Sequence, residues 1–310
     1  WIERARHRQT KPATTVANDG TISNLWLQSD LLTYNNGQTY EGRNYLTVST
    51  GTSLFVTDKI SLVNDRLTFT PGVRYTQLQR NFTNTASSGS GLGANYTTTA
   101  TYGDFLPSVG ANLKLNDHWQ VYADVTKNMR APANYELAGW VSSVTYAQGV
   151  VSTSTLTPFG VNPETSVTSE FGLRFNGEIF HGSITAYNVD FKNRIAASFD
   201  PVTLTYTDYN VGNSQDQGIE FQIGTTPVKG WSGFVSFTSD NNKLKSDFNS
   251  TYSSGPMASQ QVTVPTSGKT FPDSPSTMAA AQLQYTQGGF IAALSAKYTA
   301  ARFTTLMNDE

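Results

Sequence analysis

The sequence contains no cysteine, little charge and no long apolar segment. Charged residues make up 14% of the 310 residues, and the formal net charge is −2. This near-neutral balance argues against nucleic-acid binding, which needs a basic excess. No window approaches the roughly 18 consecutive apolar residues of a membrane helix, which excludes a helical membrane protein. The absence of cysteine fits a bacterial envelope protein, although cytosolic proteins also lack it in many cases.

The sequence also lacks the common catalytic motifs. It has no G-x-S-x-G, no H-E-x-x-H and no Walker sequence. Gly89, Gly91 and Gly93 form a glycine string, but no helix is expected after it, so it indicates a loop tip. His118 and His181 fall beside predicted turns without metal-ligand spacing. We therefore expect no enzyme activity, no catalytic residue, no bound metal and no cofactor.

What the sequence does contain is long runs of alternating apolar and polar residues. In the stretch 103–139, two runs of about 12 residues flank the polar turn Asn116-Asp117-His118. The apolar positions are Phe105, Pro107, Val109, Ala111, Leu113, Leu115, Trp119, Val121, Ala123 and Val125. A period of two places alternate side chains on opposite faces of a strand. Strands of this length with one apolar face indicate a lipid bilayer as solvent, because ordinary strands have about 5 or 6 residues.

The spacing of turns extends this pattern along the chain. Tight turns are predicted near positions 64, 117, 177, 228 and 287, and long polar loops over 9–42, 80–102, 131–162 and 242–273. Asn176-Gly177 predicts a type I′ turn with positive φ at both residues. In the segment 179–194, Tyr187, Val189 and Phe191 are expected on the apolar face. A bulge or mixed packing is expected nearer the turn, where the apolar residues change parity.

Short turns on one side and long loops on the other are typical of an outer-membrane barrel. A soluble sandwich or solenoid would have shorter strands and no one-sided loop lengths. We therefore predict an all-β fold, a transmembrane antiparallel β-barrel with about ten strands and the end of another.

Four sequence phrases resemble the TonB-dependent outer-membrane receptors. They are Lys127–Leu137 (KNMRAPANYEL), Asn162–Thr165 (NPET) followed by Glu170–Leu173 (EFGL), Val189–Ile195 (VDFKNRI), and Asn210–Gly212 (NVG) with Gln217–Glu220 (QGIE). They occur in the family's order and at the expected strand positions, and the resemblance covers the whole chain.

The resemblance implies that residues 1–310 are part of a 22-stranded barrel, with ten or eleven strands present. The N-terminal plug and the last strands are expected to be missing. It also implies localisation in the bacterial outer membrane and uptake of a ferric siderophore or related chelate, with iron as cargo. The implied partners are TonB-ExbB-ExbD acting through the plug, outer-membrane lipid and lipopolysaccharide. Alternatives are a receptor for cobalamin, haem or a sugar, a passive porin, or a barrel enzyme or adhesin.

Two groups of residues are candidates for ligand binding. Arg4, Arg6 and Arg8 share one parity near the predicted barrel mouth, with His7 between them. Their guanidinium groups suit an anionic ferric chelate, and equally suit lipopolysaccharide phosphate or plug carboxylates. The second group lies at the loop end after the predicted strand 119–128 and consists of Arg130, Tyr135, Trp140 and Tyr146. These loop aromatics close over a ligand or pack within the loop.

Charged residues on the polar face of the strands are predicted to face the lumen and the plug. They are Arg74, Lys114, Asp124, Glu170, Arg174, Asp190 and Glu220. Aromatic residues near strand ends are predicted to form the interfacial girdle. They are Trp119, Phe180, Tyr187, Phe191, Trp231 and Tyr285.

Overall fold

The computed structural model of the chain describes residues 2–12, 41–84, 96–133, 140–147, 150–157, 160–200, 205–251 and 261–309. All of its regular elements are β-strands. The chain forms two compact units. Unit 1 contains 1–54, 75–104 and 131–162, and unit 2 contains 55–74, 105–130 and 163–310. No helix in the described part of the chain is long and apolar enough to cross a membrane.

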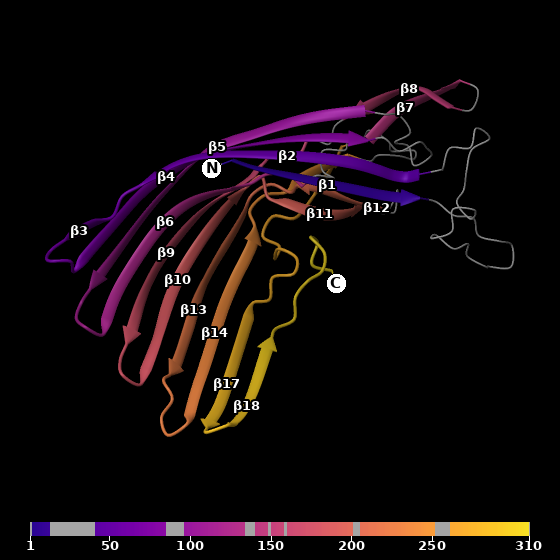
Figure 1. Ribbon diagram of the computed structural model, residues 1–310. Helices are drawn as coiled ribbons and strands as arrows, with labels where there is room; N and C mark the ends of the chain where they lie inside the picture. Colours follow the sequence, from indigo (N-terminus) through magenta and orange to yellow (C-terminus); the bar gives the residue numbers. More distant parts are fainter. Residues whose placement is uncertain are drawn as a thin grey trace, which may run out of the picture. The chain divides into compact units, whose positions relative to one another are not determined.

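One 12-stranded sheet contains most of the strands, in the order β1-β2-β4-β5-β6-β9-β10-β13-β14-β17-β18, with β3 paired to β4. Their bounds are β1 (Ile2–Pro12), β2 (Glu41–Thr57), β3 (Ile60–Leu62), β4 (Leu67–Asn84), β5 (Tyr96–Lys114), β6 (Trp119–Arg130), β9 (Glu164–Asn176), β10 (Phe180–Lys192), β13 (Ser214–Thr225), β14 (Trp231–Leu244), β17 (Thr277–Gln287) and β18 (Phe290–Thr299). Figure 1 shows β6 to β18 of unit 2 side by side in this order. The strands of this sheet pair in chain order, as in a meander of hairpins, although a separate small hairpin lies in sequence between β6 and β9, between β10 and β13, and between β14 and β17.

Three additional hairpins lie outside this sheet. They are β7 (Trp140–Ala147) with β8 (Val150–Thr157), β11 (Ile195–Asp200) with β12 (Thr205–Asn210), and β15 (Phe248–Thr251) with β16 (Gln261–Val264). The first and the third fall in the predicted loops 131–162 and 242–273, and the second lies outside the predicted loops. β4 and β5 also extend to Asn84 and Tyr96, into the predicted loop 80–102.

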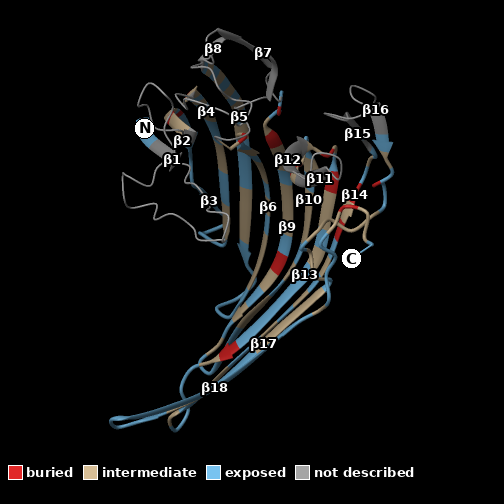
Figure 2. Cartoon of the chain, turned by 90° about the vertical axis from the view of Figure 1, so that its right-hand side faces the viewer, coloured by how far each residue is buried: buried red, intermediate tan, exposed pale blue. Residues whose placement is uncertain are grey.

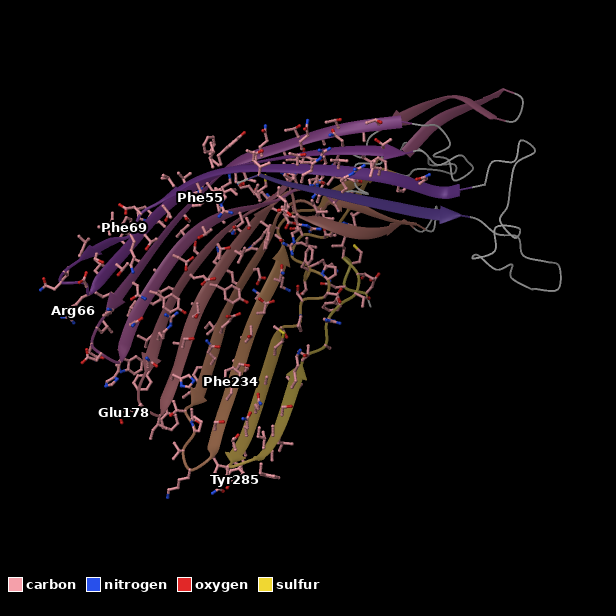
Figure 3. The ribbon with its side chains drawn as sticks, viewed as in Figure 1. Phe55, Arg66, Phe69, Glu178, Phe234 and Tyr285 are labelled. Atoms are coloured by element: carbon pink, nitrogen blue, oxygen red, sulfur yellow. The ribbon has the colours of Figure 1, made fainter. Side chains whose placement is uncertain are left out.

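The tight turns are where they were predicted, and they hydrogen-bond to one another across the end of the sheet in unit 2. Asn176 N donates to His118 O at 2.8 Å, and Thr226 N donates to Ile179 O at 2.8 Å. The Arg66 guanidinium donates to the carbonyls of Lys114 and Leu115. Figure 3 shows Arg66, Glu178 and Tyr285 at this turn end. The predicted type I′ turn at Asn176-Gly177 is wrong, because neither residue has positive φ and the connection runs over 177–179.

The sheet of unit 2 has one apolar and one polar face. Phe171 pairs with Ala123 on one side and Ala186 on the other, all on the apolar face. Large exposed hydrophobic side chains on this face include Val109, Leu113, Phe171, Ile184, Phe221, Val235, Leu283 and Leu294. Figure 2 shows these strands mainly in the colours of intermediate and exposed residues. Such exposure is expected where lipid, rather than a second protein layer, covers the sheet.

Strand β10 corrects one part of the prediction. Its register is continuous from His181 to Lys192 with β9 and from Phe180 to Phe191 with β13, so it contains no bulge. Tyr187, Val189 and Phe191 pair with Glu170, Thr168 and Ser166 and therefore lie on the polar face. Tyr187 and Phe191 thus do not belong to the girdle. At the turn end, Trp119 stacks on Phe175 (4.7 Å between ring centroids) and Trp231 on Tyr285 (4.8 Å), on the apolar face.

Candidate functional site: the polar face and the loop end

One row of register partners crosses six strands on the polar face of unit 2. It runs from Gly110 through Asp124, Glu170, Tyr187 and Gly218 to Asp240. Directly opposed residues of an antiparallel pair have Cβ atoms about 4.5–5.5 Å apart. Asp124 and Glu170, two predicted lumen residues, are therefore immediate neighbours. The row concentrates carboxylates and one phenol at a single level of the sheet.

Two tyrosines on this face each cross a glycine of the adjacent strand and form a hydrogen bond with the strand beyond it. Tyr122 of β6 lies over Gly172 of β9 and hydrogen-bonds to Thr185 of β10. Tyr187 of β10 lies over Gly218 of β13 and donates to Asp240 Oδ1 of β14 at 2.7 Å. A Cβ atom on either glycine would be 2.4 Å from the tyrosine. Gly172 and Gly218 are the glycines of EFGL and QGIE, two of the family-like motifs. Because they have no side chain, they leave room for the tyrosine rings to cross their strands.

The other predicted lumen charges lie on the same face of unit 2. Arg174 pairs with Gln120, and Gln120 pairs with Lys114. The guanidinium of Arg174 lies 5.0 Å from the Tyr122 ring centroid, and that of Arg74 lies 5.6 Å from the Phe55 ring centroid. Glu220 pairs with Thr185.

Asp190 is the exception, and its predicted position is wrong. It pairs with Val167 and Gln215, which places it on the apolar face near the loop end of β10. There it accepts a 2.7 Å hydrogen bond from Asn188 Nδ2. The alternation within 179–194 suggested the opposite face, because it could not reveal the register with β9.

At the loop end, a clasp joins two of the family-like motifs. Glu164 of NPET accepts hydrogen bonds from Arg194 Nη1 (3.2 Å) and from Ile195 N (2.8 Å). The Arg194 guanidinium lies between the rings of Phe191 (3.9 Å) and Phe271 (4.5 Å). Burial lowers the pKa of Arg194, and the Glu164 carboxylate counteracts this by raising it. The clasp fixes the point where β9 begins and β10 ends.

A small hydrophobic core lies next to this clasp. Val211 and Leu244 are fully buried, and Leu306 packs on them together with Phe271. Gly212, of the NVG motif, has φ +90° and approaches Ser246 too closely for a side chain. The loop end of unit 2 is therefore packed like a soluble protein, although the strand walls are not.

Three buried oxygen atoms near the core have no hydrogen-bond partner in the described part of the chain. They are Ser214 Oγ, Asp216 Oδ1 and Asn242 Oδ1. Asp216 pairs with Asn242 in register, and its Oδ2 accepts a hydrogen bond from Asn242 Nδ2 at 3.4 Å. Buried acceptors of this kind usually hold an ordered water. Among the described residues, no group of three His, Cys, Asp or Glu is placed to hold a metal ion.

The predicted ligand-binding residues are only partly described. Arg130 is exposed at the loop end of β6, and its register partner is Glu164. It also contributes to the electrostatic field at Arg194. Tyr135 lies outside the described residues, and the side chains of His7, Arg8, Trp140 and Tyr146 do as well. A role for these five, and for Arg130, in binding a ligand stays a prediction.

Arg4 and Arg6 lie on β1 in unit 1, and both are exposed. They pair with Thr50 and Val48 of β2. On the opposite face of β2, Tyr45 stacks on Phe82 at 5.0 Å and Ser53 hydrogen-bonds to Thr76. Arg4 and Arg6 therefore share a face with the exposed Leu54, and not with the packed side of β2.

Comparison with known proteins decides the family. The sequence matches the family model described as TonB dependent receptor-like, beta-barrel, over residues 6–309. The chain belongs to the TonB-dependent receptors. Its fold is accordingly that of a transmembrane antiparallel β-barrel, and its location is the bacterial outer membrane. The fold and family are those of transporters and receptors rather than enzymes.

Relatives of this TonB-dependent receptor chain include siderophore receptors. It is 32% identical over 99 residues to the probable TonB-dependent siderophore receptor PirA of Acinetobacter baumannii, which is 30% of this chain and 13% of PirA. The crystal structure of the siderophore receptor PiuA from Acinetobacter baumannii matches 98% of this chain and 42% of PiuA, with TM-score 0.65 and 15% identity. The ferric-catecholate import receptor Fiu of K12 E. coli matches 97% of this chain and 41% of Fiu, with TM-score 0.62 and 16% identity. At these identities the solved structures establish the fold alone, and this chain spans well under half of each relative.

The sequence had not revealed several residues of the site. Tyr122, Tyr187, Asp216, Asp240 and the clasp partner Arg194 were not singled out for their contacts. The signal for the tyrosines was the glycine inside each family-like motif, since a glycine in a long strand often marks a close approach of another group. The clasp had no sequence signal, because Glu164 and Arg194 are 30 residues apart.

Proposed function

We propose that residues 1–310 belong to the barrel of a longer receptor that takes up a ferric siderophore or similar iron chelate. The observation that carries this is the family match over residues 6–309, which spans nearly the whole chain. The relatives named as siderophore receptors favour an iron chelate over other cargo. Iron enters as cargo within the chelate, and the protein itself contributes binding and passage.

The polar face of unit 2 supports a structural role next to a plug domain. Asp124, Glu170, Glu220, Lys114 and Arg174 present both signs of charge on one face. We propose that these groups pair with the polar surface of a plug, and that TonB-ExbB-ExbD moves this plug. Bridging tyrosines keep the wall rigid while the plug rearranges. The chelate then binds at the loop end, where Arg130 is exposed.

Uptake of radioactive iron tests this proposal. A strain that lacks the receptor gene is supplied with one siderophore at a time, of catecholate, hydroxamate or citrate type. We expect uptake of one class to fall at least about tenfold on deletion, to return with the intact gene, and to stop when TonB is deleted or a protonophore is added. Unchanged uptake of every siderophore would refute the iron proposal, and restored growth on cobalamin, haem or a sugar would replace it.

The Arg130→Gln variant tests the binding residue separately. We expect about tenfold weaker binding of an anionic ferric chelate, because one charge-assisted hydrogen bond is lost. Arg302→Gln is the matched control, since Arg302 is also exposed at the loop end and pairs with Asp273. Equal affinities of the two variants would exclude Arg130 from the binding site without affecting the uptake proposal.

A further inference from the structure

A polar cluster near the loop ends of β13 and β14 has no role in the uptake proposal. These two strands of unit 2 are hydrogen-bonded neighbours (Figure 1). Asp216 of β13 is the register partner of Asn242 of β14, and Asp240 lies two residues before Asn242 on the same face. Ser214, two residues before Asp216, also lies on this face. Opposed Cβ atoms are about 4.5–5.5 Å apart and diagonal neighbours about 7–8 Å, so these four residues form one group, called the aspartate cluster below.

The hydrogen bonds of Asn242 leave two adjacent acceptor oxygens without a donor. Asn242 Nδ2 donates to Asp216 Oδ2 at 3.4 Å and to Ser274 Oγ at 3.2 Å. The amide and the carboxyl group are therefore in contact, and Asn242 Oδ1 and Asp216 Oδ1 are buried without a partner among the described residues. Ser214 Oγ is buried in the same way. Asn242 is only 6% exposed and Ser214 only 1%.

Only a small group can reach these oxygen atoms. They have almost no solvent-accessible surface in this chain. A side chain of a plug domain, or a chelate in the lumen, needs accessible surface to make contact, so neither can satisfy them. A water molecule or a single ion is small enough to lie within the cluster.

The charge of the cluster favours an ion over a water molecule. Asp216 and Asp240 are two acidic side chains on neighbouring strands. Arg194 interacts electrostatically with Asp216, but its guanidinium pairs with Glu164 at 3.2 Å. Arg130, which also acts on Arg194, is exposed. A water molecule can donate hydrogen bonds to the free oxygens, but it does not offset the charge of carboxylates, and buried charge without a counterion is costly.

We infer that Asp216, Asp240 and Asn242 bind a calcium ion between β13 and β14. The available ligands are carboxylates, an amide carbonyl and the Ser214 hydroxyl, and Ca²⁺ binds oxygen ligands of these kinds. Ca²⁺ takes about six to eight oxygens in a flexible geometry and includes water among them, so a third acidic residue is not needed. Mg²⁺ fits less well, because it demands a strict octahedron and loses its water reluctantly. Tyr187 of β10 holds Asp240 in position through its 2.7 Å hydrogen bond.

Binding of radioactive Ca²⁺ to the full-length receptor in a nonionic detergent tests this inference. The probe is Ca²⁺ alone, after treatment with a chelator and without any siderophore, so the result does not depend on the uptake proposal. The variant is Asp216→Asn/Asp240→Asn. The control is Asp65→Asn/Asp117→Asn, which removes the same charge from exposed aspartates in two tight turns. We expect at least about tenfold weaker binding by the cluster variant, because both carboxylate ligands are lost, and less than about twofold change in the control.

Urea titration with and without Ca²⁺ reports the same site through stability. Ca²⁺ should raise the urea midpoint of the unmodified receptor and of the control but not of the cluster variant, because a ligand that binds only the folded state stabilises it. Asn242→Asp keeps an oxygen ligand and adds a negative charge. Its midpoint should therefore fall in chelator and recover when Ca²⁺ is added.

Equal Ca²⁺ binding by the unmodified receptor, the control and the cluster variant overturns the inference and assigns the free oxygens to ordered water. Equal displacement of the radioactive Ca²⁺ by Mg²⁺ overturns it as well, because it indicates screening of charge without a shaped site. If the cluster variant does not fold, Asn242→Asp decides, since a midpoint that Ca²⁺ fails to raise also overturns the inference.

Discussion

Phe171 and Gly172 are neighbours in β9, but they meet opposite environments. Phe171 is 61% exposed on the apolar face, and only apolar side chains of β6 and β10 are opposite it. Gly172 is buried on the polar face beneath the Tyr122 ring. The apolar face contacts lipid, whose acyl chains adapt to the shape of a side chain but exclude a charged group. On the polar face, side chains of neighbouring strands occupy fixed positions. These neighbours tolerate a charged group, but they leave no space for a larger side chain.

The largest expected effect is a charge on the apolar face. Phe171→Arg should lower the free energy of unfolding by about 2–4 kcal/mol, because the guanidinium lies near the middle of the bilayer. Urea titration of the full-length receptor in lipid vesicles measures this value. Phe171→Leu should change it by less than about 1.5 kcal/mol, because shape matters little there. The paired control is Thr168→Arg on the polar face of the same strand, and an equal loss in both arginine variants would remove the distinction between the faces.

The clasp at the loop end should be nearly as sensitive. Glu164→Gln leaves the Arg194 guanidinium between two aromatic rings without its carboxylate, and we expect a loss of about 2–3 kcal/mol. The same urea titration applies. Arg302→Gln breaks an ion pair with Asp273 whose side chains are 53% and 73% exposed, so its loss should stay below about 1 kcal/mol. A loss no larger in Glu164→Gln than in Arg302→Gln would show that the clasp contributes no more than a surface ion pair.

A single methyl group tests the requirement for shape on the polar face. Gly172→Ala places a Cβ atom 2.4 Å from Tyr122 Cζ and should cost about 1–3 kcal/mol by overpacking. Gly110→Ala is the matched control on the same face, in the neighbouring row of register partners, since its Cβ would meet only Asp124 Cβ at 3.9 Å. Adding Tyr122→Ala to Gly172→Ala should cost less than the sum of the two single variants. Additive losses would mean that the ring does not restrict the glycine.

The sequence predicts the parts of this architecture that are local in the chain. Alternation along a strand and polar residues at tight turns are both read within about ten residues, so the turns near 64, 117, 177, 228 and 287 and the strands beside them were located correctly. The strand segments inside the predicted loops 9–42, 80–102, 131–162 and 242–273 were missed. The faces of β5, β6 and β9 also followed from Val109, Val121 and Phe171, whose strands alternate cleanly. The family-like motifs correctly indicated the receptor family.

The remaining features depend on pairing between strands, which alternation does not specify. Tyr187 and Phe191 are aromatic and were expected in lipid, but the register with β9 places them beside Glu170 and Ser166. Asp190 was misplaced for the same reason. The alternation of Arg4 and Arg6 showed that they share a face, whereas the choice of face required their pairing with Thr50 and Val48. The clasp between Glu164 and Arg194 likewise exists only once β9 and β10 are paired.

The smallest expected effect concerns the turn end, which belongs to neither face. Arg66 donates to the carbonyls of Lys114 and Leu115, so it joins the turn before β4 to the turn after β5 in unit 2. These hydrogen bonds compete with water, and Arg66→Met should therefore cost only about 0.5–1.5 kcal/mol in the urea titration. Lys59→Met is the control, an exposed cation at the same end for which the structure describes no side-chain hydrogen bond. A loss as large as that of Phe171→Arg would mean that the turn end, rather than the lipid-covered wall, limits the stability of the sheet.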